Sequence, residues 1–329
     1  MVTGGAGFIG SHLVDQLIAM DVSVDVVDDL STGRLANLAS ARNRGLGLLS
    51  FHQMDVRSPA LVQLAKRRKP VVIFHLAAKT DVAQSMEDPF EDLTVNLGGT
   101  LRVIEAALAG GTSKVIFSAS AAIYGDPPAE TLPLLESTPL LPMSPYGASK
   151  RAALDYLDVY RKSRDLEYTA LVFANVYGPR QKGSAEAGVI SIFAERCLAG
   201  RPCTIFGDGT QTRDFVNVLD VTDALVRAMD NGGGLMVNVG TSKETSIANL
   251  YEQIANAAGC TLRPRMLARR PGEIDRSSLD NGRAATQLGW KPFTSLEVGV
   301  ADLMDWYREH PEEYATKRNR RADEESAPK

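Results

Sequence analysis

The sequence has few cysteines, few aromatic residues and no metal-binding pattern. It contains 3 cysteines, 4 histidines and 2 tryptophans among 329 residues. The cysteines, Cys197, Cys203 and Cys260, are odd in number and match neither a disulfide framework nor zinc-ligand spacing, so we interpret all three as structural. The histidines are scattered without cysteine or carboxylate companions, and we therefore predict no metal site.

Long hydrophobic runs and a strong charge of one sign are also absent. The longest apolar run, at 71–78, is interrupted by His75 and is too short to cross a bilayer. The N-terminus has no charged region followed by an apolar signal core. With a net charge of -4 and no basic run before the tail, the chain has no electrostatic footprint for nucleic acid. We therefore expect a cytoplasmic protein without a membrane or nucleic-acid partner.

The composition is that of an ordinary folded protein, with 44% hydrophobic and 23% charged residues. The length suggests two domains. Up to about residue 120, short β-rich runs alternate with helical segments such as Ser11–Ala19 and Pro89–Ala109. This pattern predicts an α/β fold with a doubly wound parallel sheet. The expected strands are Met1–Thr3, Ser23–Asp28, Leu48–Gln53, Val71–Leu76, Lys114–Ser118, Tyr168–Phe173 and, after a Gly- and Pro-rich region, Leu235–Gly240.

A glycine triplet follows the first expected strand. Gly4, Gly7 and Gly10 stand between that strand and an amphipathic helix. Glycines there allow a tight turn and close backbone approach, and the helix N-terminus offers free N–H groups to a pyrophosphate. An ordinary glycine-rich turn is an equally good interpretation of the triplet alone. Only Met1–Thr3 precede the glycines, whereas strands usually have about five residues, so we expect the native strand to begin upstream.

A carboxylate ends the second expected strand. Asp28 lies at the position where an acid accepts hydrogen bonds from the adenosine ribose hydroxyls, and its charge favours NAD over NADP. The nearby Arg34 keeps NADP open as an alternative cofactor. Without other evidence, a turn-forming role for Asp28 is the slightly better interpretation.

Tyr146 and Lys150 form a YxxxK motif in a helix that Ser144 caps and Pro145 begins. The spacing puts both side chains on one helix face. A phenol is a poor base at neutral pH unless a cation stabilises its phenolate, which Lys150 and a positive nicotinamide could do. Ser120 lies at the carboxyl end of a parallel strand, where ligands bind. Alone, YxxxK is more often a solvated helix face, and the serine a loop residue. The order of all these features together favours an active site.

The sequence resembles the extended short-chain dehydrogenase/reductase family, in its NAD-dependent epimerase/dehydratase branch, and within it the UDP-glucose 4-epimerases. The similarity extends through about Pro292. The matching segments are TGGAGFIGSHL, VVDDLSTG, HLAAKTDVAQSMEDP, VNLGGT, FSASAAIYGDP, SPYGASK, NVYGPRQ, FGDGTQTRDFVNVLDV, RPGEIDRSSLD and LGWKP.

The resemblance implies roles for individual residues of the site. Ser120, Tyr146 and Lys150 would be catalytic. The residues that would bind NAD are Gly4, Gly7, Phe8, Ile9, Gly10, Asp28, Asp29, Ser31, Thr32, Gly33, Asp55, Val56, Leu76, Ala77, Ala78, Thr80, Asn96, Ser118, Tyr146 and Lys150. The residues that would bind a UDP-sugar are Ser120, Tyr146, Asn175, Val189, Thr204, Phe206, Arg213, Arg270, Glu273 and Ser277. Without the family, Arg213 and Arg270 would be interpreted as surface ion-pair partners.

The implied activity is the interconversion of UDP-galactose and UDP-glucose through a 4-keto sugar. Dehydratases of the branch carry an Asp-Glu pair, and UDP-glucuronate decarboxylases a Glu, where this chain has Ala121 and Ala122, so the acid/base for elimination is missing. The family's Arg-x-Phe-Asn appears here as 172–175, Val-Phe-Ala-Asn, which leaves extra room near the nicotinamide. The small Ser277 predicts tolerance of N-acetyl sugars.

The resemblance also suggests domains, an assembly and alternatives. We expect an NAD-binding Rossmann domain at 1–174 with a returning segment near 212–241, a smaller UDP-sugar lobe at 175–310, and a disordered tail at 311–329. A homodimer would form through helices near 90–108 and 146–163. The alternatives are a 4-epimerase for UDP-GlcNAc/UDP-GalNAc or UDP-glucuronate, a UDP-sugar 4-reductase, and a non-catalytic NAD-sensing scaffold.

Overall fold

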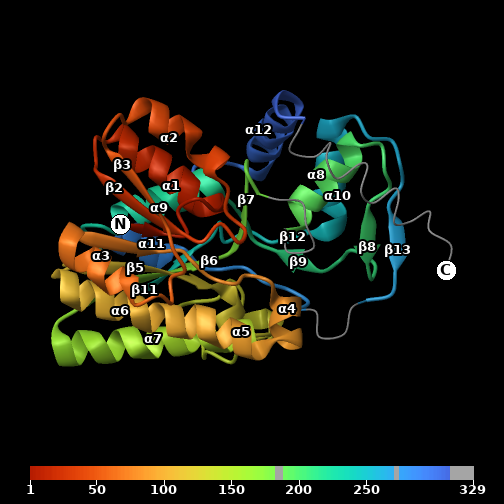
Figure 1. Cartoon of the computed structure of the whole chain (residues 1–329). Helices are drawn as coiled ribbons and strands as arrows, with labels where there is room; N and C mark the ends of the chain where they lie inside the picture. The colour runs from red at the N-terminus through yellow and green to blue at the C-terminus, as the bar shows by residue number, and fades with distance from the viewer. Residues whose placement is uncertain (182–187, 270–273, 312–329) are drawn as a thin grey trace.

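The computed structural model describes residues 1–181, 188–269 and 274–311. At its centre lies a seven-stranded sheet in the order β11-β6-β5-β4-β1-β2-β3, with every neighbouring pair parallel (Figure 1). The strands of this sheet are β1 (Val2–Thr3), β2 (Val24–Asp28), β3 (Leu49–Gln53), β4 (Val72–His75), β5 (Lys114–Ser120), β6 (Glu167–Phe173) and β11 (Leu235–Val239). The doubly wound α/β fold predicted from the sequence is confirmed.

The first strand is short but central. β1 has 2 residues, and its Val2 pairs with Val26 of β2 on one side and with Phe74 of β4 on the other. The strand order reverses at this point, because β2 and β3 lie to one side of β1 and all later strands of the sheet to the other. Open α/β sheets bind ligands at such a reversal, at the carboxyl ends of the strands. The glycine turn after β1 therefore opens onto the expected crevice.

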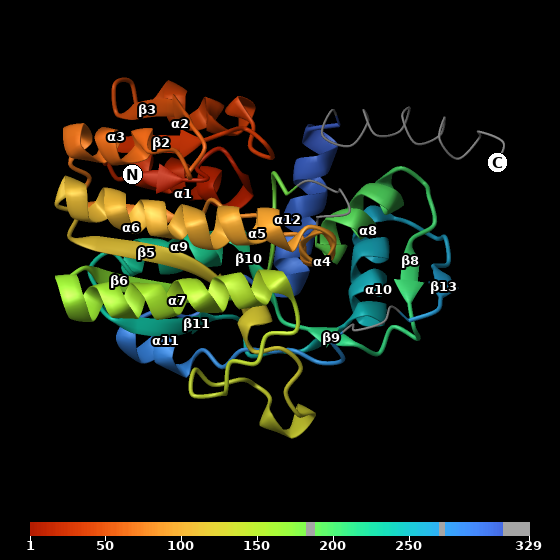
Figure 2. The ribbon, with the colours of Figure 1, turned by 60° about the horizontal axis from the view of Figure 1, so that its bottom comes forward.

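Helices cover both faces of the sheet. Those that pack together on one face are α1 (Phe8–Ala19), α2 (Ala39–Arg44) and α9 (Val218–Arg227). Those on the other face are α3 (Ala60–Arg68), α6 (Gly99–Gly110) and α7 (Pro145–Arg164) (Figure 2). Because both faces are covered, β5 and β6 are buried along almost their whole length, as apolar β-rich runs in parallel sheets are.

The helical segment expected at Pro89–Ala109 is not one regular helix. It consists of α5 (Pro89–Leu93), a π-helical turn (Thr94–Gly98) and α6, which ends at Gly110 and is followed by the C-cap Gly111 with a φ of 69°. π-helical turns inside helices frequently mark functional sites, and the apolar periodicity alone does not reveal one. The start of α7, by contrast, is confirmed: Ser144 Oγ accepts from the Gly147 amide at 3.1 Å, and Pro145 is the first helical residue.

A second hydrophobic cluster forms beside the sheet domain, to its right in Figure 1. It gathers residues such as Phe193, Leu250 and Leu303 from three helices. These helices are α8 (Val189–Leu198), α10 (Ile247–Ala258) and α12 (Leu296–Glu309). The short strands are β7 (Asn175–Tyr177), β8 (Thr204–Phe206), β9 (Thr212–Arg213), β10 (Phe215–Asn217), β12 (Thr245–Ser246) and β13 (Arg265–Leu267), and the remaining helices are α4 (Val82–Glu87) and α11 (Gly282–Gln287).

The strand expected at Leu235–Gly240 is β11, which joins the main sheet beside β6. The domain boundaries stay a prediction, and residues 312–329 of the expected tail lie outside the described part. Within the described part, none of the helices combines the length and the apolar character needed to span a bilayer.

Candidate active site

The glycine turn after β1 leaves no room for side chains. Gly4 has a φ of +70°, and a Cβ there would lie 2.7 Å from the amide nitrogen of Ala77. A Cβ on Gly10 would lie 2.1 Å from the carbonyl oxygen of Gly4. α1 begins directly after Gly7, which is its N-cap and provides no side-chain capping bond. The first N–H groups of α1 are therefore available to an anion such as a pyrophosphate.

The acid at the end of β2 forms part of the turn and also faces the cleft. Asp28 is 7% exposed, and its Oδ2 accepts from the Ala6 amide and its Oδ1 from the Leu30 amide, both at 2.9 Å. Neighbouring Asp29 accepts from the amide of Ser31 at 2.8 Å. The turn-forming interpretation of Asp28 and the ligand-binding one are thus compatible, because a carboxylate has lone pairs for both.

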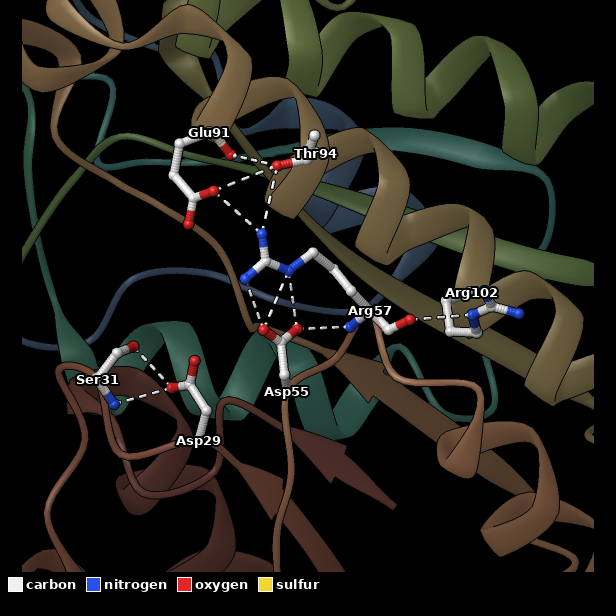
Figure 3. Close-up of polar contacts among 7 residues, drawn as sticks. All are labelled: Asp29, Ser31, Asp55, Arg57, Glu91, Thr94 and Arg102. Carbon is white, nitrogen blue, oxygen red and sulfur yellow. Dashed lines mark hydrogen bonds and ion pairs between the residues drawn. The ribbon is translucent and has the colours of Figure 1, made fainter.

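An ion-pair cluster of Asp55, Arg57 and Glu91 forms part of the cleft wall, and Figure 3 shows its contacts. Arg57 donates from Nε to both carboxylate oxygens of Asp55 at 3.0 Å, and from Nη2 to Oδ2 at 2.6 Å. Its Nη1 donates to Glu91 at 3.0 Å and to the hydroxyl of Thr94 at 3.3 Å, so it links the end of β3 to α5. The hydrogen bonds from Arg57 hold the pKa of Asp55 below its usual value. The cleft therefore presents an ionised carboxylate at Asp55.

Tyr146 and Lys150 lie one turn apart on the buried side of α7, 8% and 3% exposed. Lys150 Nζ donates to the carbonyl oxygen of Ser118 at 2.8 Å and stands 4.9 Å from the centre of the Phe117 ring. Ser120, the last residue of β5, forms a side-chain hydrogen bond with Tyr146. The three side chains of the predicted catalytic group thus converge at the carboxyl end of β5.

Burial controls the charge of this group. It raises the pKa of Tyr146, which the hydrogen bond with Ser120 partly offsets. It lowers the pKa of Lys150 to about 8, against the attraction of the Asp92 charge. The sequence predicts that Lys150 lowers the pKa of the Tyr146 phenol, but in the protein without a bound cofactor burial outweighs any such effect. The ammonium is directed to the carbonyl of Ser118.

These features border one cleft of about 370 Å³. The predicted cofactor residues that line it are Gly4, Gly7, Phe8, Ile9, Gly10, Asp28, Asp29, Ser31, Thr32, Asp55, Val56, Leu76, Ala77, Ala78, Thr80, Ser118, Tyr146 and Lys150. One continuous cavity therefore runs from the glycine turn to the tyrosine.

Three predicted residues lie behind the wall of the cleft. A Cβ on Gly33 would meet Asp28 Oδ1 at 2.6 Å, so this glycine gives the acid its space. Asn96 is 2% exposed, accepts from the amide of Lys79 at 2.9 Å and donates to its carbonyl at 3.1 Å. Ser120 stands at the rim beside Tyr146, and its Oγ accepts from the amide of Ala122 at 3.2 Å. These residues shape the cleft without lining it.

The predicted sugar-nucleotide residues are not gathered in this cleft. Among those that the structure describes, the ones beyond Ser120 and Tyr146 come from segments after β6: Asn175 on β7, Val189 at the start of α8, Thr204 and Phe206 on β8, Arg213 on β9, and Ser277 after β13. Arg270 and Glu273 lie outside the described residues.

Sequence reasoning missed several residues of the wall: Val27, Met54, Arg57, Lys79, Asp81, Gln84, Glu91, Val95, Ala119 and Phe173. Val27, Met54, Arg57, Lys79 and Ala119 are neighbours in sequence of predicted residues, and that adjacency is a usable signal. Gln84 and Val95 lie in two of the segments that match the family, which is also a usable signal, whereas Glu91 lies in none of them.

The cysteines form a small thiol cluster rather than a metal site. Cys197 Sγ and Cys203 Sγ lie 3.7 Å apart, and all three cysteines are free thiols. Over the described ranges, no group of three or more His, Cys, Asp or Glu side chains is arranged to hold a metal ion.

The fold and the cleft together define a class. A parallel sheet with a side-chain-free glycine turn, an acid after the second strand and a buried tyrosine-lysine pair at the rim is the site of an enzyme that uses a nicotinamide dinucleotide. The observations that support this fit are the positions where a Cβ would close the turn and the carboxylate of Asp28 at the cleft wall.

Comparisons with known proteins define the class further. The model of the NAD dependent epimerase/dehydratase family matches residues 1–240. The UDP-glucose 4-epimerase of Mycolicibacterium smegmatis is 47% identical over 94% of this chain and 98% of its own. The crystal structure of the Thermotoga maritima UDP-glucose 4-epimerase with UDP-glucose is 38% identical, with a TM-score of 0.89 over 94% of this chain and 98% of that one.

A third relative acts on a different sugar. The UDP-N-acetylglucosamine 4-epimerase from Methanobrevibacter ruminantium, solved with UDP-N-acetylmuramic acid, is 34% identical, with a TM-score of 0.88 over 94% of this chain and 97% of that one. Because the family model covers most of the sequence, the chain belongs to the NAD-dependent epimerase/dehydratase family. It is an NAD-dependent enzyme, as the sequence predicts.

Proposed function

We propose that the chain is a UDP-hexose 4-epimerase that interconverts UDP-galactose and UDP-glucose. The observation that carries the proposal is the convergence of Tyr146, Lys150 and Ser120 at the rim of a cleft built for a dinucleotide. The relatives of similar length named UDP-glucose 4-epimerase support the choice of substrate. Ala121 and Ala122 after the serine offer no acid for an elimination, which favours epimerisation over dehydration.

Tyr146 would carry the proton. Its phenolate oxygen would accept the proton of the sugar C4 hydroxyl in the oxidation, and the phenol so formed would return this proton in the reduction. Bound NAD supplies the hydride acceptor for C4 and, in the second half-reaction, the donor. Rotation of the 4-keto sugar, with the UDP group anchored, presents the opposite face between the two halves and inverts C4. The net reaction consumes no reductant.

Lys150 and Ser120 support Tyr146 in different ways. The ammonium of Lys150, held at the end of β5 by the Ser118 carbonyl, stabilises the phenolate electrostatically. Ser120 forms a hydrogen bond with the phenol and orients it toward the reacting oxygen. Burial of the pair strengthens both interactions, because charges are less screened away from solvent.

The UDP group would bind to the second cluster, on the side of the cleft where β8 and β9 lie. We propose Asn175, Val189, Thr204, Phe206 and Arg213 as its described contacts. The guanidinium of Arg213 suits a diphosphate in charge and geometry. Arg270 and Glu273 are proposed from the family resemblance alone.

A panel of UDP-sugars tests the proposed function. The protein, incubated with UDP-galactose or UDP-glucose, should give the same equilibrium mixture from either side, with no net change in NADH. Consumption of one NADH per product would instead identify a 4-reductase. Absence of turnover on every UDP-sugar would leave the non-catalytic NAD-sensing scaffold.

A second substrate class is favoured by one observation. Ser277 is a small residue where a bulky tyrosine in some relatives restricts the sugar pocket, so we propose that UDP-GlcNAc and UDP-GalNAc are also epimerised. The relative named UDP-N-acetylglucosamine 4-epimerase supports this proposal. Comparable kcat/KM values for UDP-GalNAc and UDP-galactose are expected, whereas strict preference for UDP-galactose would contradict the proposal. UDP-glucuronate belongs in the same panel.

We also propose a homodimer through α5 to α6 and α7. Exposed apolar side chains lie on these helices: Phe90 is 78%, Leu93 45%, Tyr156 42% and Val159 56% exposed. A second copy of the chain would cover such side chains. Light scattering after size-exclusion chromatography should give twice the mass of the chain, and Val159→Glu should give monomers. A cytoplasmic location stays a prediction.

A further inference from the structure

A buried carboxylate on α5 has no part in the chemistry described so far. Asp92 is 2% exposed. Ser149 Oγ donates to its Oδ1 at 2.7 Å, and Asn96 Nδ2 donates to its Oδ2 at 2.9 Å. Both donors are neutral, and within the described ranges no basic side chain lies at ion-pair distance from Asp92. A buried charge is costly unless an opposite charge compensates it, so this carboxylate needs a cation slightly further away.

That cation is Lys150. Ser149, which holds Asp92, directly precedes Lys150 on α7, and its hydroxyl oxygen also lies 3.0 Å from the carbonyl oxygen of Tyr146. The carboxylate therefore packs on the very helical turn that carries the tyrosine-lysine pair, behind the cleft wall. The π-helical turn contributes to this arrangement, because it carries Asn96, whose amide reaches both Asp92 and, at 3.3 Å, the Ser149 hydroxyl.

Lys150 is likewise a buried group that can carry a charge. It is 3% exposed, and its described polar contact is a neutral carbonyl, that of Ser118. Burial lowers its pKa to about 8, and the charge of Asp92 is the influence that raises it. Burial likewise raises the pKa of Asp92, and the charge of Lys150 is among the influences that lower it. Each group thus favours the charged form of the other.

We propose that Asp92 is a positioning residue of the epimerase reaction, a buried counter-ion that keeps the Lys150 side chain charged beside Tyr146. The proposal rests on the proposed function for its kinetic consequence. Asp92 touches neither the cleft nor the reacting atoms, and it acts through Lys150.

Other charged groups lie around the Asp92–Lys150 pair. Lys79, Asp81, Asp88 and Glu91 border a small hollow that Asp92 also lines, and all except Asp88 line the cleft together with Lys150, but none of these four is buried. His75 on β4 faces Lys150, and its pKa is lowered to about 3 by burial and by the charge of Lys150, so its ring is neutral. Tyr146 shares the helix turn, and the charge of Asp92 contributes to its raised pKa. Asp92 is therefore the carboxylate that is buried together with the lysine.

The substitution Asp92→Asn tests the charge alone. An asparagine can accept from Asn96 and donate to Ser149, so both contacts survive. Without the carboxylate, the pKa of Lys150 should fall by about one unit or more, and the pKa of Tyr146 should also fall. Both limbs of the pH profile of kcat should therefore move to lower pH, with KM for UDP-glucose little changed. Asp88→Asn, an exposed change at a cap position that asparagine also fills, should leave the profile in place.

A titration without turnover separates the two proposals. In protein with ¹³Cε-labelled lysine, assigned with Lys150→Arg, the Lys150 signal should titrate at lower pH in Asp92→Asn than in the unaltered chain. Should Asp92→Asn fail to fold, Lys150→Met provides the reciprocal arm, in which the ¹³C-carboxyl signal of Asp92 should titrate at higher pH. An unchanged titration in the available variant, or a rate loss equal at every pH, would overturn the role of Asp92. Absence of any UDP-sugar turnover with a shifted titration would overturn the proposed function and leave the coupling intact.

Discussion

The side-chain ammonium of Lys150 on α7 donates a 2.8 Å hydrogen bond to the main-chain carbonyl of Ser118 near the end of β5. This bond connects a helix face to the rim of the sheet and fixes the charge one helical turn from the phenol of Tyr146. Side chains held by packing and hydrogen bonds keep a reactive geometry within a fraction of an ångström. The relationship explains why the position of Lys150, and not only its charge, matters to the chemistry.

The pH dependence of the reaction should report on Lys150. Burial lowers its pKa from 10.5 to about 8, so the ammonium is present below pH 8 and lost as the pH rises through this value. We expect kcat to decline by up to about tenfold per pH unit above 8. In Lys150→Arg the guanidinium stays charged, so this alkaline decline should disappear, although kcat at pH 7 should be lower because the planar group cannot reproduce the contact with Ser118. An alkaline decline retained in that variant would assign it to another group.

Removal of the phenolic oxygen should stop proton transfer. Tyr146→Phe keeps the ring and its packing, so we expect kcat to fall by about 10²- to 10⁴-fold with KM for UDP-glucose within about threefold. The measurement is the rate of UDP-galactose formation at saturating substrate, with bound NAD quantified in the same preparation. Tyr156→Phe, an exposed tyrosine almost three turns further along α7, is the matched control. A turnover rate unaffected by Tyr146→Phe would remove the proposed proton carrier.

The glycine turn should tolerate no methyl group at position 10. A Cβ there would lie 2.1 Å from the carbonyl oxygen of Gly4, and neither backbone can move without disturbing β1 or α1. We expect Gly10→Ala to lower the free energy of unfolding by about 2 to 3 kcal/mol or more and to prevent the retention of NAD. Chemical denaturation and the absorbance of bound cofactor measure these effects.

Gly98→Ala provides the contrast to Gly10→Ala. Its Cβ would meet nothing within 4 Å, and its φ of -60° is helical. The substitution should leave the free energy of unfolding unchanged or raise it by about 0.5 to 1 kcal/mol. Equal losses in the two variants would refute the steric argument.

Arg57 should matter for cofactor affinity through the carboxylate it holds. Arg57→Ala removes the paired hydrogen bonds to Asp55 and the link to Glu91, so the carboxylate is free to turn away from the cleft. We expect the dissociation constant for NAD to rise by about tenfold, with Arg57→Lys intermediate because an ammonium cannot donate in parallel to both oxygens.

Calorimetric titration of NAD into cofactor-free protein measures this affinity. Arg68→Ala, which breaks an exposed ion pair with Asp25 away from the cleft, should leave it unchanged. Unaltered NAD affinity in Arg57→Ala would show that Asp55 keeps its place without the arginine.

The local parts of the site could be predicted from the sequence. Gly4 and Gly10, Asp28 after the second strand, and Tyr146 and Lys150 one turn apart behind the Ser144 cap depend on backbone conformation and on neighbours a few residues away. Strand and helix periodicity placed these segments at one edge of a parallel sheet, where the structure also has them. The helix at Pro89–Ala109 was predicted without its π-helical turn, because the apolar pattern on either side of that turn is nearly continuous.

The remaining relationships depend on the tertiary structure. Arg57 meets Glu91 across 34 residues of sequence, and Ser149 meets Asp92 across 57. In the sequence alone, an acidic residue exposed on a helix cannot be distinguished from a buried acidic residue that acts as a counter-ion. Only the packing of α5 against α7 decides which acid loses its water and must be compensated. The sequence by itself determined which chemical groups this protein carries and the local geometry of its turns and helices. Only the tertiary structure decided the burial that sets the charge of Tyr146, Lys150 and Asp92. The reason is that the desolvation of a group depends on everything packed around it.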